Sequence, residues 1–71
     1  MKQEDRENLA RAYESAWMAV KNRPITITIE SDGWFTRRFY GWSGLPDKKR
    51  ASDLIRGLAD LTSQLPKKGT V

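Results

Sequence analysis

Residues 25–40, ITITIESDGWFTRRFY, organise the rest of the chain. The first part, Ile25–Glu30, alternates apolar and polar residues and is rich in β-branched side chains, which is typical of a strand with one buried face. Ser31–Gly33 supplies turn residues, and the aromatic-rich segment Trp34–Tyr40 has the composition of a returning strand. The sequence therefore predicts a β-hairpin over about residues 25–40.

The loop length decides which side chains of the hairpin share a face, because a slip of one residue exchanges the faces. A two-residue loop would place Arg38 opposite Ile27, among the isoleucines, and we reject this register. A three-residue loop closed by Gly33 in the left-handed region avoids that conflict. The predicted pairs are then Ile29 with Phe35, Ile27 with Arg37, and Ile25 with Phe39.

This register predicts an apolar inner face and an unusual outer face. The inner face consists of Ile25, Ile27, Ile29, Phe35 and Phe39, with Arg37 as the one misfit. The outer face consists of Thr26, Thr28, Glu30, Trp34, Thr36, Arg38 and Tyr40, with Trp42 just beyond. Large aromatic residues and arginine are common anchors of binding surfaces, so the outer face is the more function-like side of the hairpin.

An amphipathic helix is predicted before the hairpin, over about residues 3–22. Its apolar stripe consists of Leu9, Tyr13, Ala16, Trp17 and Val20. Four alanines favour the helix intrinsically, and Pro24 ends it because the residue before a proline is pushed out of the helical region. Met18 points away from the stripe.

A second helix is predicted over about residues 47–65, after a loop at about 41–46. Pro46 suits a first helical position and Asp47 a helix start, with a start at Ser52 as the alternative. The apolar stripe consists of Ala51, Leu54, Ile55, Leu58, Leu61 and Leu65. Gly57 is unfavourable inside a helix, so we expect it to allow close approach of the hairpin or of another chain. A mobile basic tail is expected at 66–71.

These elements predict one α+β domain over residues 1–71, in the order helix, strand, strand, helix. A two-stranded hairpin is not stable alone in water, so both helices should pack on its isoleucine face. The predicted core consists of Leu9, Tyr13, Trp17, Val20, Ile25, Ile27, Ile29, Phe35, Phe39, Leu54, Leu58, Leu61 and Leu65. The other face is left uncovered unless a second copy of the chain covers it, so a homodimer is one option.

Composition argues against catalysis. The 71 residues include no cysteine and no histidine, which excludes disulfides and removes the commonest general base and the commonest metal ligand. Ser43 has no histidine partner and lacks nucleophile-elbow spacing, and Glu30 and Asp32 are interpreted as solvated turn residues. We therefore expect a protein that is not an enzyme and that uses no cofactor or metal.

The charge and hydropathy pattern bounds the partners and the location. The net charge of +4 suits nucleic acid or an acidic protein surface. No apolar run approaches the roughly 20 residues that span a bilayer, and the polar N-terminus does not resemble a signal peptide. We expect no membrane partner and a cytoplasmic protein, or one delivered inside a virion.

Two binding hypotheses follow, and a protein partner is favoured over nucleic acid. In the first, the chain docks on an acidic protein surface as an inhibitor, adaptor or assembly factor, of the kind common among phage and mobile-element accessory proteins. The partner-binding residues are then Trp34, Arg38, Tyr40, Trp42, Lys48, Lys49 and Arg50. In the second, bases stack on Trp34, Tyr40 or Trp42. The phosphate-binding residues are then Arg37, Arg38, Lys48, Lys49 and Arg50.

The layout over Leu9–Leu65 also resembles the phage head-tail joining proteins of the gpW type. The shared features are an alanine-rich first helix, a hairpin that turns at Asp32-Gly33, a second helix and a basic end. The aromatic return strand and the segment Trp42–Arg50 depart from that pattern. The resemblance implies an adaptor related to a virion, and no functional residue is carried over from it.

Overall fold

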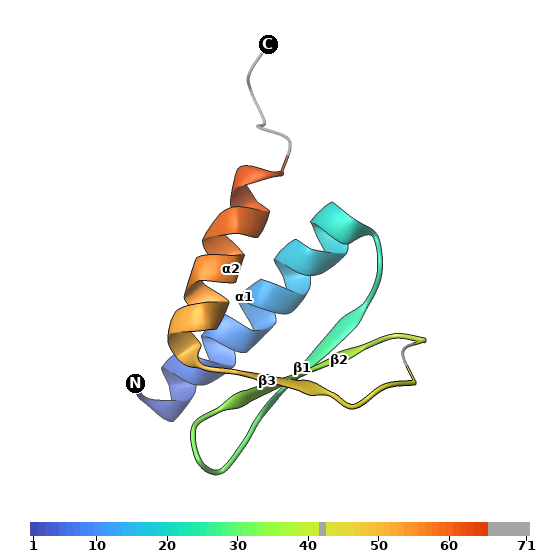
Figure 1. Ribbon diagram of the computed structural model, residues 1–71. Coiled ribbons are helices and arrows are strands. Elements are labelled where there is room, and N and C mark those ends of the chain that lie inside the picture. Colours follow the sequence, from blue (N-terminus) through green and yellow to red (C-terminus); the bar gives the residue numbers. More distant parts are fainter. Residues whose placement is uncertain (42, 66–71) are drawn as a thin grey trace.

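The computed structural model describes residues 1–41 and 43–65 and has the predicted α+β class (Figure 1). The elements are α1 (Gln3–Lys21), β1 (Ile25–Ile29), β2 (Phe35–Phe39), β3 (Asp47–Lys49) and α2 (Ala51–Ser63). The three strands form one antiparallel sheet in the order β1-β2-β3. The predicted tail at 66–71 lies outside the described residues.

Helix α1 begins where the sequence predicts and ends one residue earlier than expected. Asn22 takes the left-handed conformation, with a φ of 56°, and its backbone N–H donates to the Met18 carbonyl at 2.9 Å. This closes the helix before Pro24 and turns the chain into β1. The predicted boundary at about Asn22 is therefore correct to within one residue.

The predicted hairpin register is confirmed. Ile29 lies opposite Phe35, and the remaining pairs follow from this one along both strands. In the turn, the Gly33 N–H donates to the Glu30 carbonyl at 3.0 Å, and the Glu30 N–H donates to the Trp34 carbonyl at 2.8 Å. Gly33 has a φ of 87°, the left-handed conformation that the three-residue loop requires.

The third strand was not predicted, and the predicted helix start at Asp47 is wrong. Asp47–Lys49 is extended and pairs antiparallel with β2, so α2 begins only at Ala51, close to the alternative start at Ser52. The Asp53 side chain accepts a hydrogen bond from the Arg50 N–H at 3.3 Å, which marks the helix start there. Backbone pairing with β2 thus outweighs the local helix signal of Pro46 and Asp47.

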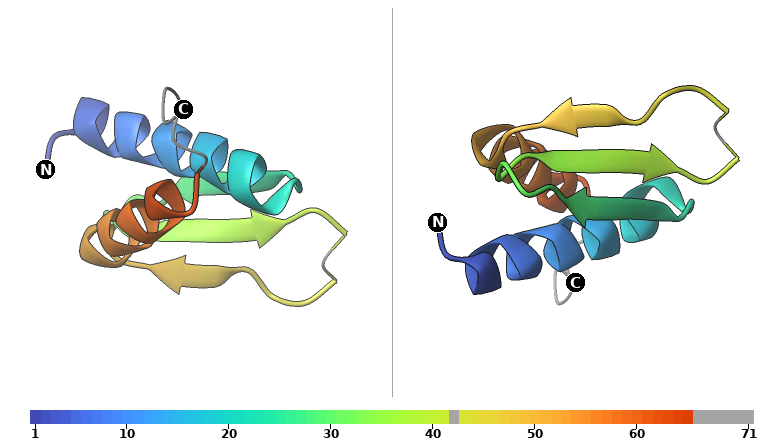
Figure 2. Two further views of the ribbon diagram at one scale, coloured as in Figure 1. Left: turned by 90° about the horizontal axis from the view of Figure 1, so that it is seen from above. Right: turned by 90° about the horizontal axis from the view of Figure 1, so that it is seen from below.

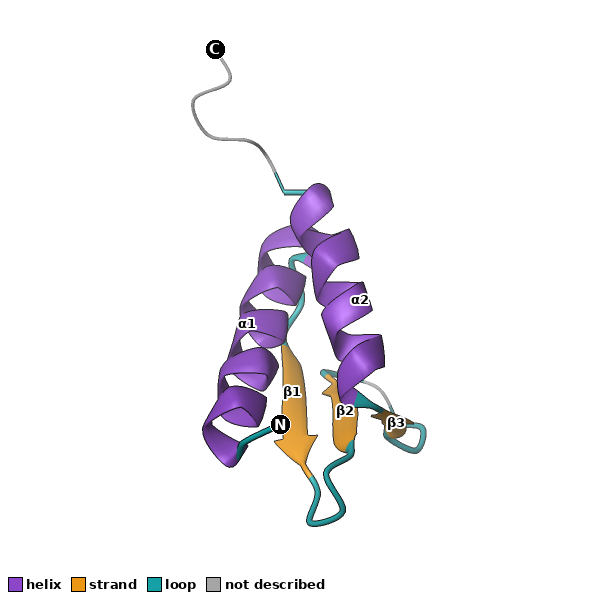
Figure 3. Cartoon of the chain, turned by 90° about the vertical axis from the view of Figure 1, so that its left-hand side faces the viewer, coloured by secondary structure: helices purple, strands orange, loops and turns teal. Residues whose placement is uncertain are grey.

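Both helices lie on the same side of the sheet and beside each other (Figures 2 and 3). The centre of the core is Phe35 and Leu54, which are 0% and 1% exposed. The buried residues are Leu9, Ala10, Tyr13, Ala16, Ile25, Ile27, Phe35, Leu54 and Leu61. Residues packed against them are Trp17, Val20, Ile29, Phe39, Ala51 and Leu58. The predicted core is therefore largely confirmed, although Leu65 is half-buried after the end of α2 and lies outside this cluster, Ile55 of the predicted stripe is 50% exposed, and Ala10 was missed.

The free edge of β1 is closed by side chains of α1. Ile27 lies at a position where the backbone N–H and C=O point away from β2. The Ile27 N–H donates to Glu14 Oε2 at 2.7 Å, and Arg11 Nη2 donates to the Ile27 carbonyl at 2.8 Å. Arg11 and Glu14 also form an ion pair at 2.9 Å. This pair occupies the backbone groups that an added strand would use, which protects the edge from pairing with another chain.

We expect the double variant Arg11→Ala, Glu14→Ala to self-associate, because it frees the Ile27 backbone groups at the edge of β1. Light scattering over a concentration series measures the molar mass of the variant in solution, which rises if the chains associate. The control Lys2→Ala, Glu7→Ala removes one charge of each sign from exposed positions near the start of α1. A double variant as monomeric as this control would contradict the protective role.

Gly57 allows close approach of α1, whereas the sequence suggested the hairpin or another chain. A Cβ atom at this position would lie 3.0 Å from Cε2 and 3.4 Å from the hydroxyl of Tyr13. The Tyr13 ring is buried and therefore has little room to move. The absent side chain lets the aromatic ring lie against the backbone of α2.

Gly57→Ala should therefore fail to give the gain of about 1 kcal/mol that alanine normally brings to a helix interior, and we expect a net loss of about 1 kcal/mol. Urea denaturation measures the free energy of unfolding. The control Ala59→Gly, at an exposed position of the same helix, reports the intrinsic propensity and should cost about 1 kcal/mol. A stabilised Gly57→Ala variant would contradict the close packing.

Candidate docking surface

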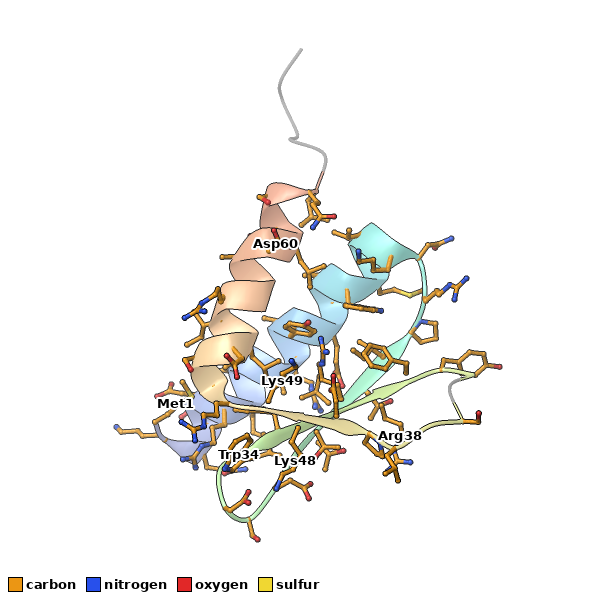
Figure 4. All side chains as sticks on the ribbon, in the orientation of Figure 1. Met1, Trp34, Arg38, Lys48, Lys49 and Asp60 are labelled. Atoms are coloured by element: carbon orange, nitrogen blue, oxygen red, sulfur yellow. The ribbon has the colours of Figure 1, made fainter. Side chains whose placement is uncertain are left out.

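The outer sheet face is the side of the sheet that points away from the helices. It carries Thr26 and Thr28 of β1, Trp34 before β2, Thr36 and Arg38 of β2, and Lys48 of β3. Figure 4 shows Trp34, Arg38 and Lys48 on this side and Lys49 on the helix side of β3. In the part of the chain that the structure describes, no helix or strand covers this face. The separation follows from the alternation of side chains along each strand.

Trp34 is the centre of a cationic cluster at one end of this face. The Lys48 Nζ atom lies 5.3 Å and the Arg50 Cζ atom 4.9 Å from the centroid of the Trp34 ring. Both distances are in the range of cation–π attraction. Asp32 completes the group, since its carboxylate lies 3.3 Å from Lys48 Nζ and accepts the Trp34 backbone N–H at 3.1 Å. We call Asp32, Trp34, Lys48 and Arg50 the Trp34 cluster.

The Asp32 carboxyl of this cluster is held in its charged form. The backbone N–H of Trp34 is the main cause that lowers the pKa of Asp32 below its ordinary value of 3.8, and the Lys48 ammonium group adds to the effect. The carboxylate stays ionised at neutral pH and balances one of the two cations. The Trp34 cluster thus has two positive charges and one negative charge.

Arg38 and Tyr40 lie at the other end of the face, beside the chain reversal after β2. Both are exposed, and Tyr40 is 82% exposed. They help to line a hollow of about 300 Å³. Its lining residues are Pro24, Thr26, Arg38, Phe39, Tyr40 and Gly41. The hollow is a concave feature at the end of the sheet, bordered by the exposed guanidinium group of Arg38 and the phenol ring of Tyr40.

Arg37 does not join the other cations, because its side chain lies on the inner face. Its Nε donates to Asp47 Oδ1 at 2.9 Å, its Nη2 donates to Asp47 Oδ2, and its Nη1 donates to the Tyr13 hydroxyl at 2.8 Å. The Asp47 hydrogen bonds are the main cause that raises the pKa of Arg37 above its ordinary value. Arg37, the misfit among the isoleucines, thus forms an ion pair with Asp47 that joins β2 to β3. Its hydrogen bond to Tyr13 extends the connection to α1. Because its guanidinium already donates to Asp47 and Tyr13, we no longer propose Arg37 as a phosphate-binding residue.

Lys49 also lies apart from the outer sheet face, since it pairs opposite the inner residue Phe35. It helps to line a groove of about 530 Å³ beside α2. The lining residues are Tyr13, Arg37, Lys49, Asp53, Leu54, Arg56, Gly57 and Asp60. Sequence reasoning missed this groove because it depends on the third strand. Buried polar side-chain atoms of the described residues all have hydrogen-bond partners, so the charged groups of the groove that face a ligand are those at its surface, such as Lys49 and Arg56.

Other predicted residues are placed as follows. Ser43 is exposed in the loop after β2, and Leu45 in the same loop is 91% exposed, a feature the sequence reasoning did not single out. Trp42 lies outside the described residues. Among residues 1–41 and 43–65, no group of three acidic, histidine or cysteine residues is arranged to hold a metal ion. Within the same residues, neither helix has the length and apolar character that crossing a membrane demands.

Comparisons with models of known protein families, with curated proteins and with solved structures gave no match. The resemblance to the gpW type therefore rests on element order and on the Asp32-Gly33 turn. The third strand is an additional difference, because that layout is a helix, a hairpin and a helix. The role of the outer sheet face is therefore interpreted from the geometry of this chain alone.

The Arg37–Asp47 pair predicts how stability depends on pH. The Arg37 hydrogen bonds are the main cause that lowers the pKa of Asp47 below its ordinary value of 3.8. A carboxyl whose folded-state pKa is lowered adds stability above its unfolded pKa and loses it as the pH falls through the folded pKa. We expect the free energy of unfolding to fall as the solution is acidified below about pH 4 to 5.

Asp47→Asn should lower the free energy of unfolding by about 1 kcal/mol at pH 7. The variant should also lose less of its stability on acidification than the wild type, because it lacks the carboxyl that titrates. Urea denaturation between pH 7 and pH 2.5 measures both effects. The control Asp60→Asn removes an exposed carboxylate that accepts a hydrogen bond from Gln64 and none from an arginine. Equal pH profiles for the two variants would contradict the special role of Asp47.

Proposed function

We propose that this chain is a non-enzymatic binding protein that docks on the acidic surface of a protein partner through the outer sheet face. In this role it would act as an inhibitor, an adaptor or an assembly factor. The observation that carries the proposal is a sheet face that no described helix or strand covers, with the half-buried Trp34 ring against two exposed cations at one end and the exposed Arg38 and Tyr40 at the other.

The charge on this surface supports an acidic partner. Its cations are Arg38, Lys48 and Arg50, and the acidic residues of the adjoining hairpin turn are Glu30 and Asp32. Asp32 is already paired with Lys48. The face therefore keeps a positive excess, which would steer an acidic protein toward it and fix the orientation of docking.

The hollow beside Arg38 and Tyr40 supports a protein as the partner. A concave feature accepts a protruding side chain, and buried aromatic and arginine contacts dominate the energy of many protein interfaces. Tyr40 offers a large rigid contact area, and the exposed Arg38 can bind a carboxylate through two parallel hydrogen bonds. An acidic or aromatic side chain of the partner would fit this chemistry.

Nucleic acid is the second candidate, because the same cations could follow a phosphate backbone. Arg38 of β2, Lys48 of β3 and Arg50 beyond β3 are presented on one side of the sheet. The Trp34 ring, however, already has Lys48 and Arg50 against it, which makes it a poor platform for stacking bases. This contact is the reason that we place the protein partner first.

The test is affinity capture with the immobilised chain, followed by measurement of binding to each purified captured protein. We expect Arg38→Ala, Tyr40→Ala to weaken that binding at least about tenfold, since it removes both residues that border the hollow. The control Met18→Ala, Arg56→Ala changes one cation and one exposed apolar residue on the helices. Circular dichroism verifies that both variants are folded.

Two results would contradict the proposal. One is a purified partner whose affinity is the same for both double variants, which would place docking elsewhere. The other is tight, salt-sensitive binding of labelled oligonucleotides that is lost with Arg38→Ala, Tyr40→Ala while no protein partner is captured. That result would support the nucleic-acid candidate.

A further inference from the structure

We infer that Arg50 forms a carboxylate-binding subsite for an aspartate or glutamate side chain of the protein partner, with Trp34 as its positioning residue. This inference rests on the proposed function and identifies one specific contact within the outer sheet face. It also changes the role of Trp34, which sequence reasoning treated as an anchor that touches the partner.

The first observation is that Arg50 is held at both ends. Its guanidinium lies 4.9 Å from the centroid of the Trp34 ring. Its backbone N–H donates to Asp53 Oδ2 at 3.3 Å, and its carbonyl accepts hydrogen bonds from the N–H groups of Asp53 and Leu54 at 3.0 Å. A long side chain fixed in this way loses less conformational entropy when it binds a ligand.

The second observation is that no acidic group of residues 1–41 and 43–65 pairs with the Arg50 guanidinium. Among the described residues it forms no ion pair and no side-chain hydrogen bond, although its side chain is exposed at the surface. A guanidinium that lies against an aromatic ring keeps its N–H groups directed outward at its edge, in the geometry that matches a carboxylate.

Arg37 provides an internal comparison. Its guanidinium donates to both oxygens of Asp47, which shows the paired state of an arginine in this fold. Arg50 has the contact with the Trp34 ring, but no carboxylate in the described part of the chain pairs with it. The partner would supply the acid that Arg37 finds within its own chain.

The third observation is the charge of the Trp34 cluster, which favours a single carboxylate. Lys48 is paired with Asp32 at 3.3 Å, so one of the two cations is already balanced. One further negative charge at Arg50 would make the cluster neutral. Lys48 lies 5.3 Å from the same ring and adds attraction for that charge at longer range.

The test uses a fluorescein-labelled peptide of ten glutamates as the probe, with binding to the full chain measured by fluorescence anisotropy at low salt. We expect Arg50→Ala to weaken binding about fivefold, since it removes the free guanidinium. Arg56→Ala is the matched control, because it removes an exposed arginine from α2 and changes the net charge by the same amount. Its effect should be less than half as large.

Trp34 variants separate positioning from general electrostatics, because they leave the net charge unchanged. Trp34→Leu should weaken probe binding nearly as much as Arg50→Ala, while Trp34→Phe keeps an aromatic face and should retain most of the affinity. Arg50→Lys keeps the charge but loses the planar donor pair, and should weaken binding several-fold. Arg50→Lys also keeps the test decisive if Trp34→Leu fails to fold.

Each outcome has a separate meaning. If Arg50→Ala and Arg56→Ala bind the probe equally, the subsite is wrong, while a loss with Arg38→Ala, Tyr40→Ala would still support the proposed function. If none of these variants differs from the wild type, both proposals fail. If an oligothymidylate of the same charge binds more tightly than the peptide and depends on Arg50, the carboxylate assignment is overturned in favour of a phosphate.

Discussion

The ion pair between Arg37 and Asp47 is the contact on which the rest of the structure depends. It joins β2 to β3, and the hydrogen bond from Arg37 to the Tyr13 hydroxyl extends the connection to α1. A partly buried guanidinium would be costly without such partners. Because Asp47 must be extended to face Arg37, the chain forms a third strand before it turns into α2. The wider sheet then carries Lys48 to the outer sheet face.

The hairpin could be predicted from the sequence because its signals are local. Alternating isoleucines define one strand, and the position of Gly33 defines the turn, so the whole register follows from a few neighbouring residues. β3 gives no such signal, since Asp47–Lys49 is a short charged segment with no apolar alternation. Its strand conformation comes from pairing with β2, a contact between residues distant in sequence. The start of α2 was misplaced for the same reason.

The candidate site could also be predicted where its signals are local and could not be predicted where it depends on β3. Residues within the hairpin, such as Trp34 and Arg38, lie on the predicted face because the register was correct. The face of Lys49 could not be predicted without β3, and it lies opposite Phe35 toward the helices. The contact of Lys48 and Arg50 with the Trp34 ring also depends on β3, which brings the two cations beside a residue far from them in sequence. Composition indicated the residue types of the surface, and long-range pairing determined their arrangement.

The closed edge of β1 has a consequence for the order of folding during synthesis. Arg11 and Glu14 precede Ile27 in the chain, so the ribosome makes the groups that protect the edge before it makes the strand that needs protection. On the opposite side, β2 has an open edge until β3 is synthesised. A chain that ends in the loop after β2 would therefore have a protected edge at β1 and an unpaired edge at β2. The unpaired edge of β2 is then the place where such a chain can pair with another chain.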